Sequence, residues 1–590
     1  MSNALLSWLT DPPYTARPIH GRGIHLADDR GGWEFHAYPE LAASARRVAG
    51  SLAAQGVRPG DVVCVLLPTG FPCLSSLFGV WAAGATVCLI PPPAFAAEAE
   101  YVEHTAGILE QTAAAVTITS EGLAPLAARV LAAAGSDREP WIWRDDGDEI
   151  QPREPGELAL LQFTSGSSSR PRGVRVTWAN LHANLALIRG GLGWREGDAG
   201  ASWLPLHHDM GLIGALLTPV SVQADLWLMR PEQFIRDPAR WLRCFAVAAH
   251  TAAPPFAFEY AARRLGDRLA DLDLSAWRNA IVGAEPIDPR VLERFARLAA
   301  PAGFSPAVYL PSYGLAEATL AVTVRTSGTP APTVRVDTRS LRFGGPVAID
   351  GEGEFASSAH TPSDGDGEGG GDGEVGRDGE VGRDGEGDGD GWLIGCGGPG
   401  DGVGATVVDD GGRPLPDGHL GEIEVTGPSV TSGYHAGRAG STRFTEGGIR
   451  TGDAGFFHRG ELFVLGRMGD SLKARGRSVY MEDLEAKVVS ATGIARERCA
   501  VVGVEGTDGA SVTLFAEKTE GAWVGDATVA LRGALGDDIA ITVVIGRSGL
   551  IRKTSSGKPR RRHMWEQLRA GRLKDVRVLG TAHVTTGRPV

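Results

Sequence analysis

DVVCVLLPTGFPCLSSLFGVWAAGATVCLIPPP, residues 61–93, is the stretch that decides the fold. Two short β-rich runs, DVVCVLLP and TVCLIPPP, lie at its ends. The apolar segment from Cys73 to Ile90 approaches the length of a membrane span, but serines, a threonine and glycines interrupt it and PPP ends it abruptly. We therefore expect a buried helix and buried strands of a parallel sheet, and no transmembrane segment.

The same alternation of helix-like and strand-like runs continues along the chain. YPELAASARRVAGSLAAQG has helical spacing, and WLPL, LWLM and NAIVGAE supply strands between residues 158 and 324. After residue 391, apolar and polar residues alternate around DG and PDG turns, which predicts a small antiparallel sheet. The predicted fold class is α/β: a large N-terminal domain, residues 1–466, with two α/β subdomains and a β-rich subdomain, and a small α+β C-terminal domain, residues 467–590.

The composition is that of an ordinary soluble protein, with 43% hydrophobic and 22% charged residues. The net charge is −13, but residues 351–391 contain thirteen acidic residues and two arginines. The remaining chain is therefore near neutral, and its charge does not indicate a nucleic-acid partner. The six cysteines are scattered without a CxxC pair, and the N-terminus lacks a basic region and a long apolar core. We expect a cytoplasmic protein without disulfides or a structural zinc.

Residues 351–391 differ in kind from the rest of the chain. They contain a tandem EVGRDG repeat and few apolar residues, so we expect an acidic, glycine-rich disordered insertion. From Asp384 onward the acidic residues are spaced as at the start of an EF-hand calcium-binding loop, but the twelfth position of that loop would be Gly395 rather than glutamate. A solvated linker is the better interpretation.

LQFTSGSSSRPRGV, residues 161–174, is an apolar run that breaks into small and hydroxyl-bearing residues. It is not a Walker A loop, because six residues separate Gly166 from Gly173 and no lysine follows. Backbone N–H groups of small residues can approach phosphate oxygens, and Arg172 supplies a permanent positive charge. By itself the stretch fits either a phosphate loop or a polar turn.

Five later segments contain further residues that can bind ligands or take part in catalysis: WLPLHHDMGLIG (203–214), IVGAEPI (281–287), YLPSYGLAEATLAVT (309–323), RTGDAGFFHRGELFVLGRMGDSLKARGRSVYMEDLE (450–485) and IRKTSSGKPRRR (551–562). In this order they resemble the adenylate-forming superfamily of acyl- and aryl-CoA synthetases, peptide-synthetase adenylation domains and luciferases. The resemblance extends from roughly Tyr38 to Arg562. The chain is most similar to the fatty acyl-AMP ligases, through LPLHHDMGLIG, PSYGLAEATL, the early PPP and VDTRSLRFGGPV before CGGPG.

The resemblance implies that the chain binds ATP and Mg²⁺ and activates a fatty or related carboxylic acid. The residues implied for the nucleotide are Thr164, Ser165, Gly166, Ser167 and Arg172 at the phosphates, Gly283, Ala284, Glu285, Tyr313 and Gly314 at the adenine, Asp453 at the ribose, and Arg467 as a supporting residue. Glu317 and Thr164 would hold Mg²⁺, whose preference is for oxygen ligands. His208 would lie by the acyl carboxylate and the α-phosphate.

The C-terminal domain is implied to be mobile, with Asp470 as its hinge. Lys558 would reach the α-phosphate and the carboxylate while the adenylate forms, because a flexible point charge can enter for one step and leave for the next. The acyl group would then pass to the phosphopantetheine thiol of an acyl carrier protein. Such carriers tend to be acidic, so we expect Lys553, Lys558 and residues 560–562 to contribute a docking face.

Simpler interpretations stay open for several of these residues. His207 and His208 are adjacent, so their side chains need not converge on one metal ion. Glu317 by itself fits a favourable charge at a helix start, and residues 251–265 fit either an acyl pocket or a core helix. At the level of function, the alternatives are an acyl-CoA synthetase that uses free CoA and a catalytically inert protein with the same fold.

The phosphate loop departs from the usual TSGSTGxPKG, because Ser169 replaces a glycine and Arg172 replaces the lysine. The hinge also has Gly469 where a lysine is usual. We predict that Ser169→Gly leaves the activity equal or raises it, since glycine tolerates a positive φ. Arg172→Ala should weaken the use of ATP in an ATP–pyrophosphate exchange assay. The reverse pair of results would contradict this interpretation of the loop.

Overall fold

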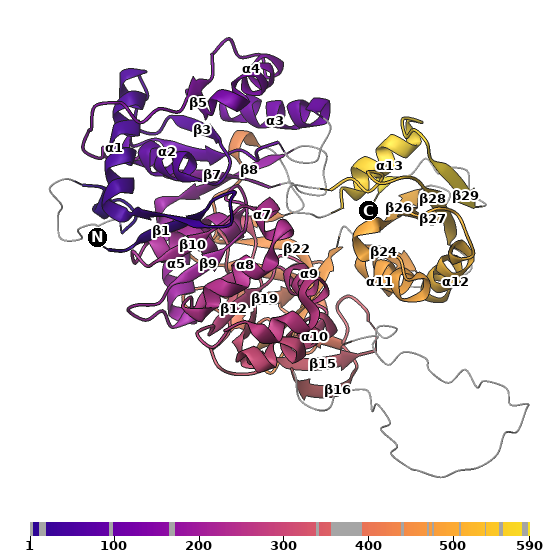
Figure 1. Ribbon diagram of the computed structural model, residues 1–590. Coiled ribbons are helices and arrows are strands. Elements are labelled where there is room, and N and C mark those ends of the chain that lie inside the picture. The colour runs from indigo at the N-terminus through magenta and orange to yellow at the C-terminus, as the bar shows by residue number, and fades with distance from the viewer. Residues whose placement is uncertain are drawn as a thin grey trace, which may run out of the picture.

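A mostly parallel six-stranded sheet contains the stretch quoted above, in the computed structural model shown in Figure 1. The structure describes residues 4–10, 19, 21–93, 98–164, 171–337, 341–355, 392–437, 442–468, 471–474, 477–506, 509–536, 539–553, 559–580 and 588–589. The sheet's strands, in spatial order, are Trp141–Ile142 (β6), Val116–Thr119 (β5), Val62–Leu66 (β3), Thr86–Leu89 (β4), Leu158–Thr164 (β7) and Arg172–Thr177 (β8). Only β8 runs antiparallel to its neighbour.

The prediction of a buried helix between two parallel strands is confirmed. Helix Phe71–Ala82 (α2) connects β3 to β4, which pair in parallel. Its Trp81 is fully buried, and the indole Nε1–H donates a hydrogen bond of 2.7 Å to the carbonyl oxygen of Ala159. Among the residues that the structure describes, no helix is both long and apolar enough to cross a membrane.

A second sheet of seven strands lies beside the first. Its strands, in spatial order, are Tyr309–Pro311 (β13), Asn279–Val282 (β12), His250–Ala253 (β11), Gly200–Ser202 (β9), Leu226–Leu228 (β10), Gly23–Ala27 (β1) and Trp33–Ala37 (β2). All neighbours are parallel except β1 and β2. Thus the N-terminal hairpin completes the second sheet, although the next strand along the chain, β3, belongs to the first.

Helices pack between the two sheets and on their outer faces. One hydrophobic cluster joins strands of both sheets to α2 and to helices Tyr38–Ala54 (α1) and Trp178–Leu192 (α5). Helices Glu98–Thr112 (α3) and Ala124–Ala133 (α4) cover the outer face of the first sheet. Helices Pro255–Leu265 (α9) and Pro289–Ala299 (α10) cover that of the second. The shorter helices are Thr218–Val220 (α6), Pro231–Arg236 (α7) and Pro238–Leu242 (α8).

The predicted β-rich part is present between the second sheet and the C-terminus. Its main antiparallel sheet consists of Gly404–Val408 (β19), Gly421–Thr426 (β20), Gly448–His458 (β22), Arg443–Thr445 (β21) and Glu461–Arg467 (β23). Smaller sheets contain Ile349–Glu354 (β16), Pro332–Val336 (β15) and Trp392–Ile394 (β17), and Thr323–Val324 (β14) with Gly398–Pro399 (β18). Because β16 pairs with β15, the insertion expected from residue 351 was placed too early. Residues 356–391 lie outside the described residues.

The remaining elements form a smaller body, the C-terminal body, drawn in orange and yellow in Figure 1. Its elements are Ser471–Ala474 (β24), Arg477–Tyr480 (β25), Met481–Thr492 (α11), Cys499–Gly506 (β26), Gly509–Ala516 (β27), Trp523–Leu535 (α12), Ala540–Ile545 (β28), Arg561–Arg569 (α13), Arg577–Gly580 (β29) and Arg588–Pro589 (β30). Two hydrophobic clusters lie wholly within it. The domain boundary after residue 466 and the mobility of the C-terminal domain stay predictions.

Asn184 of α5 fastens the segment that follows β13 to the helical layer. Its side chain is fully buried, and its Nδ2 donates hydrogen bonds to the carbonyl oxygens of Ala318 (3.3 Å) and Ala321 (2.8 Å). Its Oδ1 accepts a third, of 3.0 Å, from the Ala321 N–H. A single side chain therefore satisfies three backbone groups next to Glu317.

We predict that Asn184→Ala lowers the stability of the N-terminal domain by about 2–4 kcal/mol, because it leaves these buried backbone groups without partners. The thermal unfolding midpoint should fall by about 2–4 °C, given the unfolding entropy of a domain of this size. The matched control is Gln55→Ala, since the exposed Gln55 amide donates only one hydrogen bond, of 3.4 Å, to Ser51. Equal midpoints for the two variants would contradict the prediction.

Candidate active site

A cavity of about 1880 Å³ lies between the second sheet, the β-rich sheet and the C-terminal body. It reaches the carboxyl ends of β12 and β13, which is where ligands usually bind in open α/β sheets. Its volume exceeds the 300–1,000 Å³ or so that is common for small-molecule pockets. The cavity therefore has room for a nucleotide together with a second, largely apolar ligand.

Eleven of the predicted site residues line this one cavity: Thr164, Arg172, His208, Gly283, Ala284, Glu285, Tyr313, Gly314, Glu317, Asp453 and Arg467. The first and last of them, Thr164 and Arg467, are just over 300 residues apart in the sequence. Four others, Ser165, Gly166, Ser167 and Lys558, lie outside the described residues, as do Ser169 and Asp470. The structure thus brings the described candidates together, while the role of each stays a prediction.

The ends of the phosphate-loop segment are held by a β-hairpin. Thr164 is the last residue of β7 and Arg172 the first of β8, and the two are direct cross-strand partners. The intervening residues 165–170 are outside the described residues. Thr164 and Arg172 therefore lie side by side in the cavity lining.

The expected adenine segment begins where β12 ends. Val282 and Pro311 are paired at the ends of β12 and β13, and the Ser312 N–H donates a hydrogen bond of 2.9 Å to Val282. A Cβ on Gly283 would lie 2.8 Å from the Ser312 carbonyl oxygen, so only glycine fits there. Ala284 has a φ of +67°, which is uncommon for a residue with a side chain. The close pairing of two strand ends therefore determines this backbone path.

Tyr313, Asp453 and Arg467 form one hydrogen-bonded group in the cavity wall. The Tyr313 hydroxyl donates to Asp453 Oδ2 at 2.6 Å, and Arg467 Nε lies 3.0 Å from Oδ1. Burial, and then the negative charge of Asp453, raises the pKa of Tyr313 well above its usual value. The phenol therefore stays protonated and donates to the carboxylate, which retains lone pairs for the hydroxyls of a ribose.

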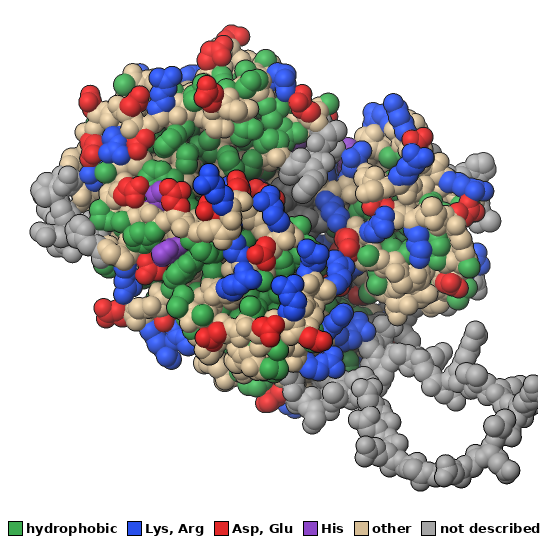
Figure 2. All heavy atoms as spheres, in the orientation of Figure 1, with side chains coloured by type: hydrophobic (Ala, Val, Ile, Leu, Met, Phe, Trp, Pro, Cys, Tyr) green, Lys and Arg blue, Asp and Glu red, His purple; other side chains and the backbone are tan. Residues whose placement is uncertain are grey.

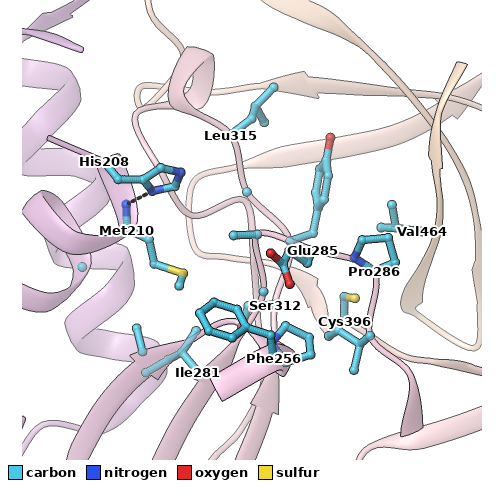
Figure 3. Close-up of a pocket in the computed structure, with 18 of the residues that line it drawn as sticks. His208, Met210, Phe256, Ile281, Glu285, Pro286, Ser312, Leu315, Cys396 and Val464 are labelled. Carbon is cyan, nitrogen blue, oxygen red and sulfur yellow. Dashed lines mark hydrogen bonds between the residues drawn. The ribbon is translucent and has the colours of Figure 1, made fainter. Parts of the chain in front are cut away.

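His208 lies on the wall opposite Glu285 and Pro286, as Figure 3 shows. Its Nδ1 is 2.8 Å from Asp209 Oδ1, and the Met210 N–H lies 3.3 Å from Nδ1 and 2.7 Å from Asp209 Oδ1. Met210 is also the first residue of a π-helix, Met210–Leu217, a form often found at functional sites. Asp209 thus helps to hold the His208 imidazole in one orientation in the cavity wall.

His207 has a different environment from His208. Burial, and then the neighbouring His208, lowers the pKa of His207 to about 3. Its Nε2 is buried and has no hydrogen-bond partner among the residues described. No group of three His, Cys, Asp or Glu side chains in the described part of the chain is arranged to hold a metal ion.

One face of helix α9 lines the cavity, and the opposite face packs in the core. Phe256 and Tyr260 line the cavity, and Figure 3 shows Phe256 beside Ile281 and Ser312. Phe258 and Ala261 are fully buried in the core beneath. The core interpretation of residues 251–265 is therefore confirmed for one face of the helix, whereas the acyl pocket stays a prediction for the face that lines the cavity.

Basic side chains gather over α9 and α10 on the side that faces the C-terminal body (Figure 2). The arginines of these helices that also line the cavity are Arg263, Arg290, Arg294 and Arg297. Glu259, Asp288 and Glu293 line the same part of the cavity, so charges of both signs are present there.

The prediction that Arg561 contributes to a docking face for a carrier protein is wrong. Its guanidinium is buried, with Nη2 lying 2.9 Å from Glu485 Oε1 and 3.0 Å from Glu482 Oε1. Its Nε also donates to the Val501 carbonyl oxygen at 3.1 Å. Arg561 therefore holds α13 and α11 together instead of facing a partner. Arg562, which is exposed and 2.9 Å from Glu566, remains compatible with docking.

Sequence reasoning missed two polar residues, Tyr434 and Thr442, that contact Glu317 without themselves lining the cavity. The Tyr434 hydroxyl donates to Glu317 Oε1 at 2.5 Å, and Thr442 Oγ1 lies 3.3 Å from the same oxygen. Tyr434 ends the run GPSVTSGY, whose alternation was attributed only to a small sheet. A lone tyrosine after such a run has no spacing signal that connects it to a glutamate 117 positions earlier.

Comparison with known proteins places these features in context. A family model described as AMP-binding enzyme matches residues 20–358. The long-chain fatty-acid–AMP ligase FadD26 of Mycobacterium marinum is 32% identical, over 92% of this chain and 93% of that protein. The medium-chain fatty-acid–[acyl-carrier-protein] ligase JamA of Moorena producens is 29% identical, over 89% of this chain and 88% of JamA. A solved structure from a study of fatty acyl-adenylate ligases from E. coli and L. pneumophila has a TM-score of 0.79 and 26% identity, and covers 96% of this chain and 98% of that one.

We predict that His207 contributes to the loss of folding stability at low pH. Below pH 6.5 the unfolded chain protonates this imidazole, whereas the folded chain does so only near pH 3, so stability falls as the pH falls through this window. From pH 6.5 to 5.5 the wild type should lose about 1 kcal/mol more stability than His207→Gln. Thermal midpoints across this range measure the difference.

The control is His419→Gln, because the partly exposed His419 ring has one hydrogen bond among the residues described, of 3.3 Å with the Asp417 carbonyl oxygen. This variant should lose stability in parallel with the wild type. An acid-induced loss in His207→Gln as large as that of the wild type would refute the prediction.

Proposed function

The chain belongs to the AMP-binding enzyme family, within its fatty acyl-AMP ligase branch, and we propose that it converts a fatty acid and ATP to acyl-AMP and pyrophosphate. The acyl group then passes to the phosphopantetheine thiol of an acyl carrier protein. The carboxylate attacks the α-phosphorus in line with the departing pyrophosphate. The thiol then attacks the acyl carbon, and AMP leaves.

The proposal rests on one observation: the same cavity has a polar wall, suited to a nucleotide, and an apolar wall, suited to an acyl chain. Tyr313, Asp453 and Glu317 lie in the polar part, and Met210, Phe256 and Ile281 are apolar. An acyl adenylate has the same two halves, joined where the carboxylate meets the phosphate. His208 lines the cavity beside Met210, which supports its assignment to this junction.

The main barrier to the first step is repulsion between a carboxylate and a triphosphate, which positive groups must reduce. We assign this work to Arg172 at the phosphates and to Lys558 at the reacting centre. Glu317 and Thr164 supply the oxygen donors that Mg²⁺ prefers, so these residues would hold the ion, which would screen the phosphate charge. Asp453 would orient the ribose, and thereby the α-phosphate.

The acceptor and the location are parts of the same proposal. JamA is named as a ligase that acts on an acyl carrier protein, which supports a carrier as the acceptor here. We also propose a cytoplasmic location. The six cysteines are buried and none is in a disulfide, as is usual in a reducing compartment.

We predict acid-dependent ATP–pyrophosphate exchange with medium- or long-chain fatty acids. Lys558→Ala should lower the exchange rate about 100-fold or more, since it removes a charge that acts in the transition state. Lys574→Ala, at an exposed site, is the matched control and should change it less than twofold. A holo carrier protein should be acylated, and free CoA should not.

The rivals give different outcomes in the same assay. An acyl-CoA synthetase would form the CoA thioester at a rate comparable to or above that with the carrier. A catalytically inert protein would show no exchange with any acid of the panel. Either result would overturn the proposed function.

A further inference from the structure

The segment before Tyr434 is attached by hydrogen bonds to the segment that contains Glu317. The Thr431 N–H donates to the Glu317 carbonyl oxygen at 2.9 Å. Thr319 Oγ1 donates to the Ser429 carbonyl oxygen at 2.6 Å, although Thr319 has a φ of +68°, an unusual value for a β-branched residue. The two segments are thus fixed to each other at their backbones, 110 or more residues apart in the chain.

Side-chain hydrogen bonds also join these parts of the chain, at Glu317 in the cavity wall. The Tyr434 hydroxyl lies 2.5 Å from Glu317 Oε1, and Thr442 Oγ1 lies 3.3 Å from the same oxygen. All three side chains are buried. Among the residues described, both hydrogen bonds to this carboxylate reach Oε1 and none reaches Oε2. The carboxylate is therefore held by one oxygen, which leaves the other for a further ligand.

The ring of Tyr434 contacts the strand that follows the phosphate loop. The centre of the Arg172 guanidinium lies 5.8 Å from the ring centroid, within range of a cation–π interaction. Tyr434 forms a β-bridge with Val174, and the Arg175 N–H donates to the Gly433 carbonyl oxygen at 3.2 Å. One tyrosine therefore touches both the arginine expected at the phosphates and the glutamate expected at the metal.

Thr442 extends the network to the ribose side of the site. Its Oγ1 lies 3.3 Å from the Thr451 carbonyl oxygen as well as from Glu317. Thr451 Oγ1 in turn accepts a hydrogen bond of 3.1 Å from the Asp453 N–H. The buried network thus extends from Arg172 to Asp453, the two ends of the expected nucleotide site.

We propose that Tyr434 is a positioning residue for the magnesium–ATP complex. Its hydroxyl holds Oε1 of Glu317 so that Oε2 is free for the metal, and its ring keeps Arg172 beside the phosphates. This inference rests on the proposed function, because it takes Mg²⁺ and ATP as the ligands. It assigns to Tyr434 a role in binding the metal complex, distinct from any contribution to folding.

The test is Tyr434→Phe, which removes only the hydroxyl and keeps the ring near Arg172. The half-saturating Mg²⁺ concentration for nucleotide binding should rise about tenfold, because a hydrogen bond to a charged group is lost. The affinity for ATP in EDTA should change less than twofold. Equilibrium binding of a fluorescent ATP analogue, with and without Mg²⁺, measures both quantities.

A second variant and a control complete the experiment. Thr442→Val removes the longer hydrogen bond and should raise the Mg²⁺ requirement in the same direction, by about twofold to threefold. Tyr309→Phe removes another buried hydroxyl, which donates to the Leu292 carbonyl oxygen at 3.1 Å, outside the cavity. This control should leave the Mg²⁺ requirement unchanged.

The outcomes separate a positioning role from a structural one. A Tyr434→Phe variant with the wild-type Mg²⁺ requirement would overturn the inference. So would an equal loss of affinity with and without the metal. Because binding is measured without a fatty acid, an absence of pyrophosphate exchange would overturn the proposed function without affecting this test.

Discussion

The hydrogen bond from Tyr313 to Asp453 is the contact on which the arrangement of the site depends. Tyr313 follows the carboxyl end of the second sheet, and Asp453 lies in β22 of the β-rich sheet. The bond is short and buried, and its acceptor is charged, so it is stronger than an ordinary surface hydrogen bond. It closes the cavity wall on one side, as the Tyr434–Glu317 bond does on another. Two tyrosine–carboxylate pairs thus join the segment after β13 to the β-rich part of the chain.

The layered core explains why these contacts are positioned so well. In β3, Val63 and Val65 face the helices between the two sheets, whereas Cys64 and Leu66 face α3 and α4. A strand that is buried on both faces cannot slip by one residue without exchanging the two environments. The strand ends are therefore fixed: Thr164 is the last residue of β7, and Gly283 and Ser312 directly follow β12 and β13.

Much of the fold and of the site could be predicted because its signals are local. The βαβ pattern is a matter of apolar runs and turn residues within some thirty positions, and the motifs that mark the nucleotide site are contiguous. The insertion's first residues were misassigned for the same reason: IDGEGE has the composition of a linker, yet it pairs with β15 and becomes strand β16. Strand pairing depends on the partner, and the partner is not visible in the segment itself.

The sequence by itself determined the fold class, the family and eleven of the residues that line the cavity, because each depends on short patterns. Only the tertiary structure decided which of the basic residues near the C-terminus are surface groups. In KPRRR every arginine looks solvated, but Arg561 lies between Glu485 and Glu482 because α13 packs against α11. Only the tertiary structure brought Tyr434 to Glu317, since that contact requires a loop of the β-rich part to reach the end of another sheet. A pattern within one segment records what the segment can form, whereas the environment of a side chain depends on distant residues.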